Sequence, residues 1–140
     1  MLRAFPMILL AVIAYNLLVF GGMAAGHDVT ALLAQSANIK LVSGDLWKIT
    51  AGDGLVALGL LLLFIETVKA TRTEHREILN HGLSLLTFIG ALVEFIVLKG
   101  FGTSPFFFIT AMCLFDVVAG YTISIITARR DMSVIPHEDH

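Results

Sequence analysis

Four long apolar segments constrain the fold of this chain more than any other feature of its 140 residues. A helix needs about 20 predominantly apolar residues to cross the roughly 30 Å hydrocarbon layer of a bilayer. The sequence therefore predicts an all-α membrane protein that forms one domain over residues 1–140, a four-helix transmembrane bundle. The expected helices cover residues 4–22, 50–70, 78–98 and 104–128.

Composition and charge exclude several classes of protein. Charged residues make up only 14% of the chain, against about 25% in a typical soluble domain. The formal net charge of -2 offers no basic surface for phosphates. These values exclude disorder, nucleic-acid binding and an ordinary soluble enzyme. The single cysteine, Cys113, excludes a disulfide framework within one chain, and we expect it to be a small apolar packing residue.

The first apolar segment also has features of a secretory signal. Arg3 precedes it, and the small residues Ala24, Ala25 and Gly26 follow it. Its apolar run, however, is longer than the core of about 7–15 residues that is typical of a signal. We therefore expect an uncleaved membrane helix.

Lysine and arginine predict the orientation of the helices, because cytoplasmic loops carry an excess of both residues. With four spans, both termini should be cytoplasmic, and the loop over residues 23–49 should lie outside. The cytoplasmic ends then carry Arg3, Lys69, Arg72, Arg76, Arg129 and Arg130, whereas the outer ends carry Lys40, Lys48 and Lys99.

The outer loop contains two short runs of β-forming residues, 38–42 and 45–50, on either side of Ser43 and Gly44. This pattern favours a small extracytoplasmic β-hairpin over an irregular loop. Because an isolated two-stranded hairpin is marginal in water, we expect it to lie on the helix ends or on a partner. Gly44 and Trp47 are the candidate interaction residues, since glycine permits the turn and an indole ring suits a membrane interface.

Two shorter patterns lie beside the expected hairpin. Residues 29–34 suit one or two helical turns. The sequence from Thr50 to Asp53 resembles a capping box in which Asp53 replaces the usual glutamate. A carboxylate there also complements the helix dipole, so we favour this structural role for Asp53 over a catalytic one.

Small and polar residues recur at helical spacing along the third and fourth expected helices. They form either the packed interior of the bundle or the lining of a polar path. Membrane helices commonly pack through such residues, so we favour packing. This helix-packing seam consists of Ser84, Thr87 and Ala91 on the third helix and of Cys113, Gly120 and Ser124 on the fourth.

Carboxylates within membrane spans are costly and mark proton, ion or partner sites. Asp116 lies near the midplane, with no lysine or arginine at its depth, and its candidate partners are Asn16, Thr87 and hydroxyls across the bundle. Glu94 lies about 6 Å from the outer end of its helix, within reach of Lys99 or of water.

Glu66 lies close to the cytoplasmic surface, where it either snorkels or pairs with Lys69. We rank Asp116 first and Glu94 second as functional residues, with Glu66 and Asn16 as further candidates. The sequence leaves open whether Asp116 is ionised or is a structural hydrogen-bonding group.

The usual motifs of catalysis and metal binding are missing from the sequence. It contains no His-x-x-x-His or Cys-x-x-Cys pair, no nucleophile elbow and no phosphate-binding loop. A b-type haem would require two midplane histidines, and the chain has none at that depth. We therefore expect no catalytic residue, metal or cofactor, and we expect His81 to be solvated or hydrogen-bonded near the inner surface.

A family resemblance rests on two short motifs, over residues 64–73 and 116–131, and on Ser43, Gly44 and Trp47 in the outer loop. The chain resembles a group of small four-span inner-membrane proteins of alphaproteobacteria. The resemblance implies a bacterial inner membrane, and no function or mechanism follows from it.

Two functional hypotheses fit these observations. The first is a non-enzymatic accessory or assembly protein that binds another membrane protein or itself within the lipid bilayer. The alternative is a small oligomeric transporter or channel, coupled to protons or cations, that uses Asp116 and Glu94. An enzyme ranks third, and we expect no nucleic-acid partner.

Overall fold

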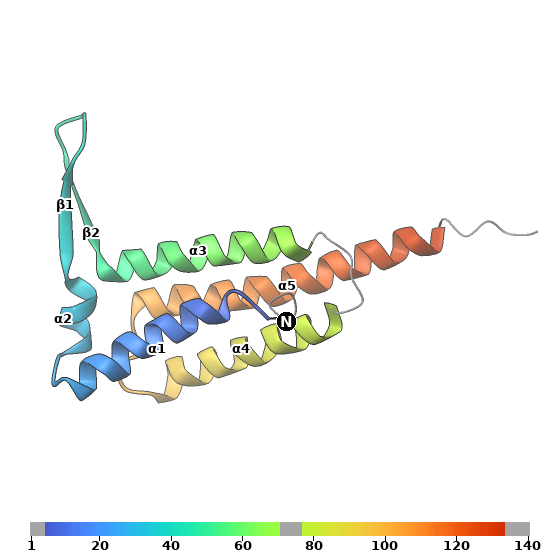
Figure 1. Cartoon of the computed structure of the whole chain (residues 1–140), viewed down its shortest axis with the longest axis horizontal. Coiled ribbons are helices and arrows are strands. Elements are labelled where there is room, and N and C mark those ends of the chain that lie inside the picture. The colour runs from blue at the N-terminus through green and yellow to red at the C-terminus, as the bar shows by residue number, and fades with distance from the viewer. Residues whose placement is uncertain (1–4, 71–76, 134–140) are drawn as a thin grey trace, which may run out of the picture.

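The computed structural model describes residues 5–70 and 77–133, which are mostly helical. Figure 1 shows the long helices side by side, with a short helix and a β-hairpin at one end, which we call the hairpin end. The elements follow in the order α1 (Leu9–Ala24), α2 (Val29–Ala34), β1 (Ser36–Lys40), β2 (Leu46–Thr50), α3 (Ala51–Ala70), α4 (Glu77–Val97) and α5 (Ser104–Ser133).

Three helices in the described part of the chain are long and apolar enough to cross a membrane, which supports a membrane protein. They are α3, residues Asn80–Val97 of α4 and residues Ser104–Ile126 of α5. The apolar helix α1 is shorter, at 16 residues, or about 24 Å.

Both ends of the helical region differ from the sequence expectation. The first helix begins at Leu9 rather than at residue 4, because the residue before a proline is disfavoured in helical conformation. Pro6 instead starts a tight turn, in which the Leu9 amide donates to the Pro6 carbonyl at 3.1 Å. The last helix continues past residue 128 to Ser133, since no glycine or proline intervenes.

The hairpin expected from the outer-loop sequence is present, as is the short helix before it. Strands β1 and β2 pair antiparallel, with Ile39 opposite Trp47. Their turn is closed by a 2.9 Å hydrogen bond from the Leu41 amide to the Asp45 carbonyl. Figure 1 shows the hairpin projecting across the direction of the helices rather than folding back over them, and no residue of either strand is fully buried.

Side-chain caps hold the elements at the hairpin end. The expected capping box is present: the Thr50 amide donates to Asp53 Oδ2 at 2.8 Å, and the Asp53 amide donates to Thr50 Oγ1 at 3.1 Å. Asp28 caps α2 by accepting a hydrogen bond from the Ala31 amide at 3.0 Å. Hydrogen bonds from the Thr30 hydroxyl and the Ala31 amide hold the pKa of Asp28 below its ordinary value.

An aromatic cluster fixes α1 against the loop between α4 and α5. Tyr15, Phe101 and Phe106 are fully buried, and the rings of Tyr15 and Phe106 lie 4.5 Å apart. The Tyr15 hydroxyl lies 2.5 Å from Thr103 Oγ1 and donates to the Gly100 carbonyl at 3.1 Å. This cluster positions the hairpin end of α1 relative to α5.

Replacing Gly44 with valine should open the hairpin turn without preventing membrane insertion. Gly44 has φ +96°, which a β-branched residue adopts at a cost of about 1–3 kcal/mol. We expect a protease to cleave the turn of this variant faster than that of the unmodified protein. Gly102→Val is the control, because Gly102 has an ordinary φ and open space around its α-carbon. Equal cleavage of both variants would contradict the prediction.

Candidate functional site

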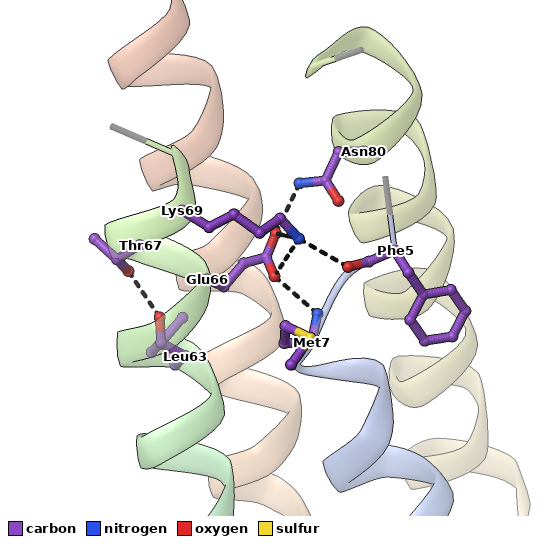
Figure 2. Close-up of polar contacts among 7 residues, drawn as sticks. All are labelled: Phe5, Met7, Leu63, Glu66, Thr67, Lys69 and Asn80. Carbon is purple, nitrogen blue, oxygen red and sulfur yellow. Dashed lines mark hydrogen bonds and ion pairs between the residues drawn. The ribbon is translucent and has the colours of Figure 1, made fainter. Parts of the chain in front are cut away.

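Glu66 of α3 is the centre of a buried polar cluster at the end of the bundle opposite the hairpin (Figure 2). Its side chain is only 1% exposed. The carboxylate accepts hydrogen bonds from the Met7 amide at 2.8 Å, from the Asn80 side chain at 2.7 Å and from Lys69 at 3.0 Å. The N-terminal segment, α3 and α4 therefore meet on one carboxylate, and we call this set of residues the Glu66 cluster.

Lys69 supplies the positive charge of the Glu66 cluster. Its ammonium lies 3.0 Å from Glu66 Oε1 and also donates to the Phe5 carbonyl at 2.9 Å. The expected pairing of Glu66 with Lys69 is therefore present. The snorkelling alternative is wrong, because the segment around Met7 donates its backbone amide to the carboxylate and helps to enclose it.

His81, which directly follows Asn80 on α4, joins α4 to α5. It is 7% exposed, and its Nε2 lies 2.7 Å from the Ser124 hydroxyl oxygen. The ring stacks on Tyr121 with centroids 5.3 Å apart. A β-carbon at Gly120 would lie 2.6 Å from the His81 ring, so the absence of a side chain at Gly120 makes room for the histidine.

Asp116 lies on α5 at the same interface. It is 6% exposed, and Ser84 of α4 lies within hydrogen-bonding reach of its carboxyl group. Among the side chains that the structure describes, only Asp116 Oδ2 and Asn80 Oδ1 are buried polar atoms without a partner. Such atoms are rare in native proteins because burial without a hydrogen bond is costly.

Glu94 is joined to α1, whereas the sequence places it within reach of Lys99 or of water. Asn16 donates to Glu94 Oε2 at 3.0 Å, in place of Lys99. For Asp116, the expected partners Asn16 and Thr87 are wrong, whereas the expected hydroxyl across the bundle is present as Ser84. Asn16 bonds to Glu94, and the Thr87 hydroxyl donates to a carbonyl of its own helix at 2.8 Å.

The predicted helix-packing seam lies inside the bundle. Five of its six members are buried and the sixth, Ser124, is half-buried. The five buried members are Ser84, Thr87, Ala91, Cys113 and Gly120.

Asn80 was not among the candidate site residues, although its spacing of four from Ser84 on the same helix face was a usable signal. Tyr15 was also missed, because nothing in the apolar first segment marks the residue that bonds to the α4–α5 loop.

Two grooves lie at the hairpin end. One, of about 300 Å³, is apolar in character and lies between the end of α4 and the start of α5; Phe107 and Phe108, each 51% exposed, contribute to its wall. The other, of about 420 Å³, runs between the end of α1 and the α4–α5 loop, and its wall includes Asp28 and Lys99. Among the described residues, no group of three or more His, Cys, Asp or Glu side chains is placed to hold a metal ion.

No protein-family model, curated protein or solved structure significantly matches this chain.

Proposed function

We propose that this protein is a non-enzymatic accessory or assembly subunit of a bacterial inner membrane that binds another membrane protein or a second copy of itself. The observation that carries the proposal is how the buried polar side chains are used. Glu66, His81 and Glu94 each bond to a different element of the fold. Buried bonds of this kind specify one arrangement of the helices, which suits a scaffold that presents a surface.

The proposed topology has four spans with both termini in the cytoplasm. The buried turn that starts at Pro6 extends the apolar length of α1 towards the roughly 30 Å that a span requires. Lys69 and Arg129 lie at the end opposite the hairpin, in keeping with the rule for positively charged loops. Arg3, Arg72 and Arg76 carry the same argument from the sequence but lie outside the described residues.

The apolar groove beside Phe107 and Phe108 is the proposed contact for a protein partner. Both side chains are half-exposed, whereas the neighbouring Phe106 is fully buried in the aromatic cluster. The aromatic cluster holds the start of α5 rigidly, so the groove is preformed. Aromatic side chains around a preformed groove are typical of residues that contribute most to binding.

Phe108→Ala should weaken association with the partner by about 2 kcal/mol, or about 30-fold in affinity, as for an aromatic residue at an interface centre. The measurement is the amount of partner that co-purifies in mild detergent, with the partner identified by mass spectrometry. A photo-reactive phenylalanine analogue at position 107 should crosslink to the same protein, or to a second copy of the chain.

Phe115→Ala is the matched control for the partner experiment. Phe115 lies on the same helix and is 62% exposed, but it does not contribute to the groove. Partner recovery should therefore be unchanged in this variant, and an analogue at position 115 should not crosslink to the partner. Equal losses in both variants, or a purified monomer without any companion, would contradict the proposal.

The transporter hypothesis remains the second candidate because of one observation. Asp116 is buried near the middle of α5 with an unpartnered oxygen, as expected of a group that takes up and releases a proton or cation. Against this role, Glu94, the other acid of the transporter hypothesis, is bonded to Asn16 of α1.

A further inference from the structure

We propose that one face of the β1–β2 hairpin binds the lipid interface of the bilayer at the hairpin end of the bundle. The hairpin would then be a surface anchor that holds the hairpin end of the bundle at a defined depth in the bilayer. This inference goes beyond the proposed partner contact at Phe107 and Phe108, and it requires only that α3 crosses the membrane.

The strand register gives the hairpin one apolar and one polar face. Side chains of directly opposed residues share a face, and successive residues alternate between faces. Ile39 opposes Trp47, and Ala37 opposes Ile49, so these four side chains lie together. The other face is made mainly of polar residues, among them Asn38, Lys40, Lys48 and Thr50, with Leu46 as its apolar member.

The apolar face is not covered by the described parts of the bundle. Ile39 is 45% exposed and Trp47 is 54% exposed. A two-stranded hairpin is at best marginally stable in water, and an apolar face left in water would make it less so. A further surface must therefore cover Ile39 and Trp47 in the membrane.

The attachment of the hairpin to α3 places that surface at the boundary of the membrane. Strand β2 ends at Thr50 and α3 begins at Ala51, with no linker between them. The Ala51 amide donates to the Gln35 carbonyl at 2.8 Å, which ties the base of the hairpin to the end of α2. Because the strands run across the helix direction (Figure 1), they run along the membrane surface at the depth where α3 enters.

Phospholipid is the occupant that this position and chemistry favour. Amphipathic elements lie in the interface with their apolar face in the boundary between headgroups and acyl chains and with lysines on the opposite face. Trp47 belongs to the residue type that is enriched at this depth. Lys40 and Lys48 lie on the other face, where their ammonium groups stay in water or among headgroups.

Trp47 is the only tryptophan in the chain, so its fluorescence reports directly on the apolar face. The experiment uses the purified full-length protein in vesicles of phosphatidylcholine and phosphatidylglycerol, with or without bromine near the glycerol end of the phosphatidylcholine chains. Brominated lipid should quench Trp47 at least about twofold, as for a ring at the interface. Acrylamide in the water should quench it weakly.

A second variant moves the reporter to the opposite face and keeps the test decisive. Leu46→Trp in a Trp47→Phe background places the indole on the polar face, at a position that is 69% exposed. We expect brominated lipid to quench this variant little and acrylamide to quench it strongly. Both side chains are exposed, so circular dichroism should show an unchanged fold.

Two outcomes would overturn the lipid assignment. Equal quenching by brominated lipid at positions 46 and 47 would mean that the faces are not distinguished by the bilayer. A blue-shifted Trp47 spectrum without lipid quenching would mean that protein, such as a second copy of the chain, covers the face. Because these vesicles contain only the purified protein and lipid, either outcome is separable from failure of the partner experiment at Phe108.

Discussion

Glu66→Ala is expected to lower the free energy of unfolding by about 3 kcal/mol, the lower end of the range for breaking a buried ion pair. The loss leaves the Met7 amide and the Asn80 side chain without their acceptor and removes the counter-charge of Lys69. The lower end applies because Lys69 is 26% exposed and its ammonium can turn to water. Chemical denaturation in detergent, followed by circular dichroism, measures the effect.

Glu94→Ala is the matched control for the Glu66 prediction. Glu94 is also an acid within a helix of the bundle, but it is half-buried and has one side-chain donor, Asn16. Its replacement should cost about 1 kcal/mol, as for one net hydrogen bond. In Glu66→Ala, but not in Glu94→Ala, protease should also reach the chain before α1, since Met7 is held by Glu66. Equal stability losses in the two variants would show that the Glu66 cluster does not organise the fold.

Replacing Asp116 with leucine, but not with asparagine, is expected to lower the free energy of unfolding. Asp116→Asn keeps the shape of the side chain and its capacity to bond to Ser84, so the free energy of unfolding should stay near that of the unmodified protein. Asp116→Leu strands the buried Ser84 hydroxyl, at a cost of about 1–3 kcal/mol. Denaturation of all three proteins in the same detergent measures these differences.

Proton and cation flux into liposomes decides between the two functional hypotheses. Neither the unmodified protein nor Asp116→Asn should conduct, because the accessory proposal gives Asp116 no transported ion. Flux through the unmodified protein that disappears in a stably folded Asp116→Asn variant would refute the proposal and establish the transporter. An amide cannot release a proton at working pH, so this substitution removes coupling while preserving the fold.

Several local features were predictable from the sequence because they depend on residues near one another in the chain. Gly44 marked the hairpin turn, since its backbone adopts a conformation that other residues avoid. Thr50 and Asp53 predicted their own capping box three residues apart. The pairing of Glu66 with Lys69 was also local, because residues three apart lie on the same helix face.

The pairing of Asn16 with Glu94, and the choice of Ser84 among the hydroxyls that could reach Asp116, were not predictable from spacing. Which side chains meet across a bundle depends on how far each helix is shifted and rotated against its neighbours, and a single sequence does not encode this directly. Tyr15 and its bonds to the α4–α5 loop set the position of α1. That position brings Asn16 to Glu94 rather than to Asp116.

By itself, the sequence determined that this chain is an apolar, helical membrane protein with a β-hairpin between its first long helices. Hydropathy, helical spacing and turn chemistry are properties of contiguous residues, so they can be predicted without knowledge of the fold. Only the tertiary structure decided that Glu66 is buried by the N-terminal segment and that the hairpin projects across the helix direction with Trp47 exposed. Both results arise from contacts and directions set by packing between segments distant in the chain.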